Sequence, residues 1–239
     1  MGFLRTKMVG GSSIVYQCLM DRFDDIAFND WKNESGIDWF NNSEMDKHYS
    51  QVESDMVLHT FTPEERNGNA KLFVDACDKL GYKWGNLRRG QSNCGAEKGN
   101  DCVGCLGGCF RDSKQSALVA FIQKAEKEGL EIITETEIHK VEPNSNTCKI
   151  YGTQQGKNVS FEGKKVILCG GAFGTTRMMT MSGFKSKLPA LGKKFASHPQ
   201  FMWLGFQNEI VDAHKSMFQA VASKDDSFRK QGFKLENVF

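Results

Sequence analysis

Four cysteines lie close together in a glycine-rich segment and could bind a metal. Cys94, Cys102, Cys105 and Cys109 follow the spacing C-x7-C-x2-C-x3-C. Tight glycine turns let thiolates at such gaps converge on zinc or an iron–sulfur cluster. The spacing fits neither a paired C-x2-C zinc ribbon nor the common ferredoxin pattern, so the alternative is a set of partly buried thiols that stiffen a loop. Both interpretations stay open, and we assign no metal ligand.

A second stretch that could do chemistry is a glycine turn after an apolar run. Residues 166–169 are continuously apolar, as in strands that are covered on both faces. Gly170, Gly171 and Gly174 follow, and they let the backbone turn tightly and approach a ligand. A helix after this turn would direct free N–H groups at an anion. The pattern predicts a strand, a turn and a helix, with or without a bound nucleotide.

A similar turn lies near the start of the chain. Gly10 and Gly11 precede Ser12 and Ser13, which could cap a helix. The buried face of that helix would carry Ile14, Val15, Cys18 and Leu19. The turn is a second possible anion site, although a helix start without a ligand explains the same residues.

The composition describes an ordinary globular protein. The chain has 239 residues, of which 39% are hydrophobic and 25% charged, and a net charge of +2. This length supports one large domain or two small ones, and no basic block indicates nucleic acid. No run approaches the roughly 20 apolar residues that cross a bilayer, and the N-terminus lacks a signal-peptide pattern. We therefore expect a cytoplasmic location, with the eight cysteines as thiols, metal ligands or packing residues rather than disulfides.

Helix signals place three segments around these turns. A capping pair at Ser43 and Asp46 predicts a short helix through residue 52, and a single apolar face predicts another over residues 70–80 that stops at Gly81. A third helix should begin at a cap formed by Asp112 and Gln115 and end at Gly129. The aromatic residues between 21 and 39 show no period, so we expect an ordered covering loop there.

Strand signals lie between the third helix and the apolar run. Residues 131–138 predict a strand, and residues 143–146 are typical of a turn. Residues 148–153 and 159–162 then predict a hairpin around residues 156–158. A further strand could begin at residues 201–206.

Taken in order, five segments resemble the flavin-binding part of a glucose-methanol-choline oxidoreductase. They are residues 7–15, 31–39, 102–116, 166–177 and 191–199. The resemblance covers nearly the whole chain. The segment that ends in Gly-Cys-Phe-Arg-Asp-Ser-Lys-Gln is most similar to the branch of long-chain alcohol oxidases and cholesterol-oxidase-like enzymes.

The resemblance implies FAD as the cofactor and assigns residues to it. The first glycine turn would approach the pyrophosphate and flavin, the backbone at Ile138 would meet the adenine, and the second glycine turn would lie against the adenosine. The implied cofactor-binding residues are Gly10, Gly11, Ser12, Ser13, Ile138, Gly170, Gly171 and Ala172.

The sequence also departs from the family pattern. The strand and G-x-G-x-x-G turn that bind the diphosphate are not found, and Tyr16 stands where many members carry asparagine near the flavin. His198-Pro199 matches a family signature, and we interpret this histidine as structural. The chain has five histidines: His48, His59, His139, His198 and His214. None lies in the context of the family's catalytic histidine, so we assign no catalytic residue.

These observations predict an α/β protein with a partial FAD/NAD(P)-binding Rossmann-like, three-layer domain that contains a small β-hairpin or meander insertion. Residues 1–192 would form the incomplete FAD-binding domain, with the cysteine-rich loop at 90–112, and residues 193–239 would begin a substrate-binding domain. We expect a fragment, truncated at both ends, of an enzyme that oxidises CH–OH groups of small-molecule alcohols. It should bind FAD weakly and be inactive alone, unless a complementing chain supplies the missing ends. The alternatives are a noncatalytic metal-binding or interaction module, and a flavin dehydrogenase with an iron–sulfur electron exit.

Overall fold

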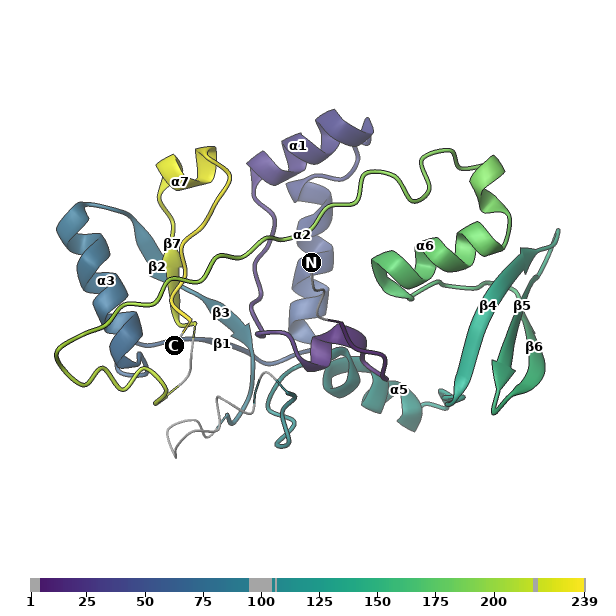
Figure 1. Cartoon of the computed structure of the whole chain (residues 1–239), viewed down its shortest axis with the longest axis horizontal. Helices are drawn as coiled ribbons and strands as arrows, with labels where there is room; N and C mark the ends of the chain where they lie inside the picture. Colours follow the sequence, from purple (N-terminus) through teal and green to yellow (C-terminus); the bar gives the residue numbers. More distant parts are fainter. Residues whose placement is uncertain (1–4, 95–104, 106, 217–218, 239) are drawn as a thin grey trace. The chain divides into compact units, whose positions relative to one another are not determined.

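The computed structural model describes residues 5–94, 105, 107–216 and 219–238. The chain forms two compact units: unit 1 comprises Met1–Leu130 with Phe206–Phe239, and unit 2 comprises Glu131–Gly205. Helices and short strands are mixed along the chain, and the described strands form three small sheets (Figure 1). The predicted mixed α/β class is confirmed. The predicted domain boundary at residue 192 stays a prediction.

Most of the described helices belong to unit 1. They are the 3₁₀ turn η1 (Gly11–Ile14), α1 (Asp25–Ser35), α2 (Asn42–Ser54), α3 (Gly68–Leu80), the π-helical segment η3 (Leu118–Ile122), α5 (Gln123–Lys127) and α7 (Asp226–Lys230). The predicted helices over 43–52 and 70–80 are confirmed, and Gly81 ends α3 with φ 74°. Their caps are asparagines: Asn41 accepts a hydrogen bond from Glu44 N, and Asn67 accepts one from Ala70 N.

The aromatic segment after residue 21 corrects the sequence prediction. We expected a covering loop, but α1 occupies its centre, and Asp24 caps it by accepting a hydrogen bond from Ala27 N. Phe28 and Trp31 lie one turn apart on this helix, and both rings contact Phe40, with centroids at 5.5 and 5.3 Å. The polar residues around them obscured the helical period in the sequence.

The helix starts beside residues 14 and 112 also differ from the prediction. The serine turn gives only the four-residue η1, because the chain then turns into a bridge between Leu19 and Arg89, with Cys18 at φ 63°. The predicted helix that ends at Gly129 is present. Its start is capped by Ser116, whose Oγ accepts a hydrogen bond from Val119 N, and not by Asp112.

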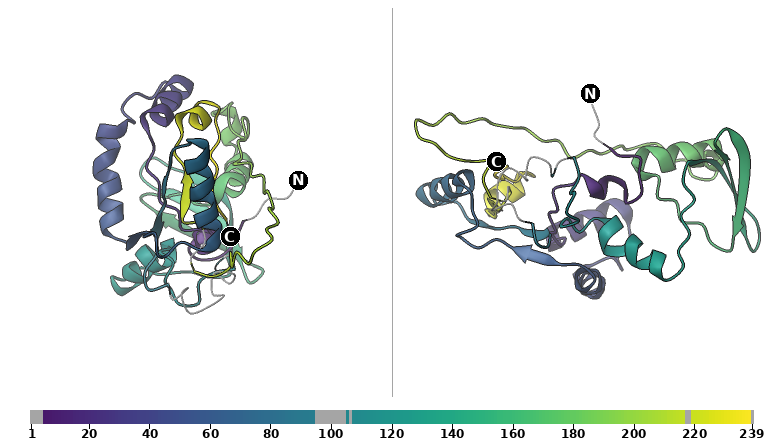
Figure 2. Two further views of the ribbon diagram at one scale, coloured as in Figure 1. Left: turned by 90° about the vertical axis from the view of Figure 1, so that its left-hand side faces the viewer. Right: turned by 90° about the horizontal axis from the view of Figure 1, so that it is seen from below.

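Short strands close unit 1 around a small core. Strand β1 (Leu58–Thr60) pairs antiparallel with β3 (Arg88–Gly90), and β2 (Trp84–Asn86) pairs antiparallel with β7 (Val221–Ser223). The two views of Figures 1 and 2 agree that α3 lies beside β7. The core residues between them are Phe61, Ala70, Val74, Ala220 and Val221, with Phe73 and Trp84 packed against the cluster. Pairing of β2 with β7 joins segments that are far apart in the sequence.

Unit 2 is a three-stranded meander with one helix. Strands β4 (Thr136–Pro143), β5 (Cys148–Gln154) and β6 (Lys157–Gly163) are antiparallel in the order β4-β5-β6. The predicted hairpin is confirmed, and its turn is Gln155-Gly156, both with positive φ, as two-residue hairpin turns require. Helix α6 (Gly171–Met181) lies beside β4 (Figures 1 and 2), and the 3₁₀ turn η4 (Phe184–Ser186) follows it. The strand predicted over 131–138 begins only at Thr136.

Two predicted strands are wrong. Residues 166–169 and 201–206 form no strand, and no ladder partner pairs with them in the part of the chain that the structure describes. Ile167 is 86% exposed, so the run is also not buried on both faces. An apolar run alone does not make a strand, because a strand also needs a neighbour for its backbone hydrogen bonds.

Within the described ranges, each helix is too short or too polar to cross a bilayer.

Candidate functional site

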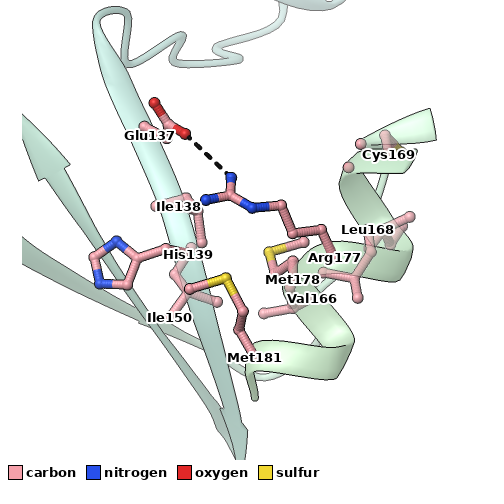
Figure 3. A pocket seen from close by; sticks show the side chains of 13 residues that line it. Glu137, Ile138, His139, Ile150, Val166, Leu168, Cys169, Arg177, Met178 and Met181 are labelled. Atoms are coloured by element: carbon pink, nitrogen blue, oxygen red, sulfur yellow. Dashed lines mark ion pairs between the residues drawn. The ribbon is translucent and has the colours of Figure 1, made fainter. Parts of the chain in front are cut away.

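Unit 2 contains a cavity of about 330 Å³ between the edge of its sheet and its helix (Figure 3). Strands β4 and β5 form one wall, α6 forms the opposite wall, and the segment after β6 closes the site. The lining residues are Glu137, Ile138, His139, Ile150, Val166, Ile167, Leu168, Cys169, Gly170, Gly174, Arg177, Met178 and Met181. Two of the residues that the family resemblance assigned to a cofactor, Ile138 and Gly170, therefore lie in one site.

The helix wall comes from one face of α6. Gly174, Met178 and Met181 recur at the spacing of a single helical face. In Figure 3 the two methionine side chains extend from α6 toward β4, and the His139 ring points away from α6. A side chain at Gly174 would meet nothing within 4 Å, so the wall is open at this position. Helical spacing could have identified this face in the sequence.

Ser182 fixes the distance between the two walls. Its Oγ donates to the Met178 carbonyl at 2.7 Å and accepts a hydrogen bond from Val141 N at 2.9 Å. The end of α6 is thereby joined to the open edge of β4. No sequence pattern indicated this contact, because it links residues that are 41 positions apart.

The backbone at Ile138 also belongs to the open edge of β4. Val141 is opposite Ile150, and Ile138 is opposite Gly152, two residues further along β5. Val141 N is bonded outside the ladder, and its partner Ile150 lies two residues from Gly152 on β5. The bulge between Ile138 and Lys140 adds one residue to β4, so we infer that Ile138, although three residues from Val141, directs its backbone N–H and C=O to the same outer side. Outward backbone groups beside an apolar cavity can hydrogen-bond the edge of a heteroaromatic ring.

The polar lining of the cavity is sparse. Arg177 Nη1 lies 3.8 Å from Glu137 Oε1, with both side chains more than half exposed, so the pair is screened by solvent (Figure 3). An apolar cavity with the Arg177–Glu137 pair at its margin suits a flat, largely apolar ligand that carries a polar group.

The glycine turn at α6 has both packing and binding features. A Cβ at Gly170 would lie 2.8 Å from Thr175 N, so glycine is needed there by the helix itself. Gly170 N also donates to Thr175 Oγ1 at 3.0 Å. Gly171 has φ 69° and open space around it, and no side chain caps the start of α6. Gly171 and Ala172 therefore lie at the helix N-terminus next to the cavity, outside its lining.

The other predicted cofactor residues lie in unit 1, where they have internal partners. Ser13 Oγ donates to the Gly10 carbonyl and accepts a hydrogen bond from Ala117 N at 2.9 Å. A Cβ at Gly10 would lie 2.9 Å from Ile14 Cδ1, whereas Gly11 has open space. Ser12 Oγ accepts a hydrogen bond from Thr6 N at 3.3 Å. These contacts give Gly10 and Ser13 roles in packing, whereas Ser12 is exposed.

A buried lysine holds this turn against the cysteine-rich segment. Lys114 is 3% exposed, and its Nζ donates to the carbonyls of Tyr16 and Cys105 at 2.7 Å and of Ile14 at 3.0 Å. Burial and the nearby Cys18 raise the pKa of Tyr16, whose hydroxyl donates to the Gln115 carbonyl at 3.0 Å. No sequence pattern indicated a buried ammonium group at this position.

The structure describes three of the four clustered cysteines, Cys94, Cys105 and Cys109, and Cys102 lies outside the described residues. Among the residues that are described, no group of three or more His, Cys, Asp or Glu side chains is placed to hold a metal ion. Cys94, Cys105 and Cys109 are thiols that are partly exposed.

A mixed α/β chain with an apolar cavity beside a glycine turn and a helix N-terminus has the features of a small-molecule binding protein. Comparison with known proteins identifies the family. Residues 1–200 match the family described as GMC oxidoreductase, and the chain belongs to this family. The FAD expected from the sequence is the cofactor that proteins of this family generally bind.

The relatives are themselves uncharacterized. A GMC-type oxidoreductase of Sinorhizobium fredii is 25% identical over 223 residues, which cover 90% of this chain and 42% of the relative. GMC-type oxidoreductases from two strains of Mycobacterium tuberculosis are each 21% identical over 220 residues, covering 90% of this chain and 34% of each relative. The chain thus spans less than half the length of the curated relatives it matches.

Proposed function

We propose that this chain is the cofactor-binding part of an FAD-dependent oxidoreductase that acts on CH–OH groups of alcohols, and that the unit 2 cavity binds the adenosine end of FAD. Family membership supports oxidoreduction, and favours it over a noncatalytic metal-binding module. When bound, FAD would accept a hydride from the alcohol carbon. The alcohol class, and the long-chain alcohol oxidase branch in particular, rest on sequence resemblance.

One observation carries the assignment of the cavity. Ile138 and Gly170 were both assigned to the adenosine half of FAD from the sequence, and both line the same cavity. Its volume lies within the range of small-molecule sites. Apolar side chains from β5 and α6 would cover the faces of an adenine ring, and the outward backbone of Ile138 would hydrogen-bond its edge.

The phosphates attached to the adenosine would be bound by Arg177 and by the backbone at the start of α6. The N–H groups at the start of α6 and the exposed Arg177 side chain are donors beside the cavity. Gly171 has no Cβ that would obstruct an approaching phosphate. These residues would bind and orient the cofactor, and none of them is assigned to proton transfer.

Binding of FAD, and of ADP and FMN as its two halves, tests whether the cavity binds the adenosine end. Titration calorimetry of the purified chain should detect FAD and ADP, with ADP competing for FAD, and should detect no binding of FMN. Gly174→Leu fills an open wall position at a site with no steric conflict and should weaken ADP binding at least 10-fold. Thr180→Leu places the same side chain on an exposed position of α6 outside the cavity and should bind normally. Equal ADP binding by both variants, or no ADP binding by the unmodified chain, would overturn the cavity assignment.

The alcohol specificity requires the longer protein. Anaerobic addition of primary and secondary alcohols to its FAD-loaded form should bleach the flavin absorbance. Absence of bleaching with every alcohol, in a protein that retains FAD and is reduced by dithionite, would reject this part of the proposal. Cytoplasmic location and a complementing chain stay predictions.

A further inference from the structure

The cavity of unit 2 lies between two contacts that join β4 to α6. In the first, Ser182 Oγ accepts a hydrogen bond from Val141 N at 2.9 Å. In the second, Arg177 Nη1 lies 3.8 Å from Glu137 Oε1. Both members of this charged pair come earlier in the chain than the members of the serine contact, so the pair lies nearer to the start of α6.

The lining differs between the two ends. At the serine contact it is apolar, because Ile150 lies opposite Val141 on β5 and Met181 comes directly before the serine. Toward the start of α6 the lining includes the charged pair and Gly170. Figure 3 shows the pair on the side of Cys169 and away from Met181. A ligand with an aromatic ring and polar substituents therefore matches the cavity in one orientation, with its polar part beside the pair.

Glu137 is the only acidic side chain among the described residues that line the cavity. An ionised carboxylate accepts hydrogen bonds and donates none, so it binds hydroxyl groups and repels a phosphate. Its side chain is 57% exposed, so it can turn from Arg177 to a ligand without leaving a buried charge. The next residue is Ile138, whose outward backbone would bind the adenine edge. The group attached to adenine in its nucleotides is a ribose with two neighbouring hydroxyls.

We propose that Glu137 makes the cavity select adenine ribonucleotides with a free 2′-hydroxyl, by accepting hydrogen bonds from the ribose hydroxyls and repelling a phosphate at the 2′ position. The inference rests on the proposed function, since it takes this cavity as the adenosine site. It adds a specificity-determining residue to that site. Glu137 binds and orients the sugar and takes no part in proton transfer.

The charge of Glu137 also limits what Arg177 can bind. Arg177 alone would accept a 2′-phosphate, because a guanidinium group binds phosphate oxygens. With the Glu137 carboxylate 3.8 Å away, the two opposite charges at this end of the cavity offset each other. Removal of the negative charge should therefore admit the 2′-phosphate, whereas removal of the hydrogen-bond acceptor should remove the preference for the 2′-hydroxyl.

Calorimetric titration of the full chain with three matched ligands tests the proposal. The ligands are ADP, 2′-deoxy-ADP and 2′-phospho-ADP, which differ only at the 2′ position. We expect ADP to bind about 10-fold more tightly than 2′-deoxy-ADP, because a hydrogen bond to a charged group is lost at an exposed position. We expect a preference of about 10-fold or more over 2′-phospho-ADP, because the added phosphate faces a like charge.

Two substitutions separate the roles of the carboxylate. Glu137→Ala should bind ADP and 2′-deoxy-ADP with equal affinity. Glu137→Gln keeps the shape without the charge and should bind 2′-phospho-ADP at least as tightly as ADP. Glu142→Gln is the matched control, because Glu142 is an exposed carboxylate of the same strand that pairs with Lys140 at 2.8 Å, outside the lining. It should keep the preferences of the unmodified chain.

The outcomes distinguish this inference from the cavity assignment. Equal binding of ADP and 2′-deoxy-ADP by the unmodified chain, with ADP binding still weakened in Gly174→Leu, would overturn the role of Glu137 and leave the cavity as the adenosine site. Equal loss of preference in Glu137→Gln and Glu142→Gln would also overturn it, because the effect would then come from net charge. No binding of ADP at all would overturn both.

Discussion

The hydroxyl of Ser13 accepts a hydrogen bond from the backbone N–H of Ala117 at 2.9 Å, across 104 positions of sequence. The same hydroxyl donates to the Gly10 carbonyl. The glycine turn is thereby joined to the start of the helix that contains η3 and α5. A residue that the sequence assigned to a cofactor has a structural contact of its own.

Ser13→Ala should therefore destabilise the protein. Removal of the hydroxyl leaves a partly buried N–H without its partner, which costs about 1–2 kcal/mol. Ser12→Ala is the control, since Ser12 is exposed and its Oγ accepts long hydrogen bonds from Thr6 N at 3.3 Å and from Thr6 Oγ1 at 3.5 Å, and it should change stability by less than about 0.5 kcal/mol. Urea unfolding followed by circular dichroism measures both, and equal losses would contradict the structural role of Ser13.

Asn67 should matter more than the other asparagine cap. It is buried, accepts a hydrogen bond from Ala70 N at 2.8 Å and donates one to the Ala213 carbonyl at 2.7 Å. Asn67→Ala should cost about 2–3 kcal/mol, because the helix start and the partly buried Ala213 carbonyl lose their partners together. Asn41→Ala removes a cap alone and should cost about 1 kcal/mol. If the two variants unfold at the same urea concentration, the contact with Ala213 contributes nothing.

Gly152 should not tolerate a side chain. A Cβ there would lie 2.4 Å from the Glu137 carbonyl oxygen and 2.8 Å from Ile138 Cδ1, so the β4–β5 pairing would have to open. Gly152→Ala should destabilise by about 2–3 kcal/mol. Gly163→Ala, whose Cβ would be 3.4 Å from the nearest carbonyl oxygen, should have little effect. Hydrogen exchange of the amides of β4 and β5 reports the local loss, and unchanged protection in Gly152→Ala would refute the steric argument.

Glu53 should link stability to pH. Its carboxylate accepts hydrogen bonds from Arg22 Nη2 at 2.6 Å and Arg88 Nη2 at 2.8 Å, and these lower its pKa to about 2. A folded-state pKa below the unfolded value of about 4.3 stabilises the protein above that value, and the contribution is lost as pH falls toward 2. Glu53→Gln should thus cost about 1–2 kcal/mol at pH 7, and the difference from the unmodified protein should shrink below pH 5.

Glu44 on the same helix is the control for this pH dependence. It pairs with Lys47 in an exposed i,i+3 arrangement, so Glu44→Gln should leave the profile nearly unchanged. Unfolding in urea at several pH values between 3 and 7 compares the three proteins. A constant gap between Glu53→Gln and the unmodified chain across this range would show that the lowered pKa has no effect on folding.

Local features of the fold followed from the sequence because they depend on near neighbours. The apolar face and glycine stop of α3, the β5–β6 hairpin and the helix after Gly170 were predicted with small errors in their ends. There were two exceptions. In α1, polar residues obscured the helical repeat of the apolar side chains. After η1, a contact with a distant segment ended the predicted helix at Cys18. The family was also recognisable, since its motifs depend only on residue type and order.

The sequence by itself determined the mixed α/β class, the family and the candidate cofactor residues. Only the tertiary structure decided that Ile138 and Gly170 share a cavity, that Ser182 joins its two walls, and that the buried Lys114 connects Cys105 to Tyr16. It also left residues 166–169 without a ladder partner in the described chain. The physical reason is that a helix or a turn is stabilised within a few residues, whereas a cavity wall, a strand pair or a buried ammonium group requires distant segments to meet.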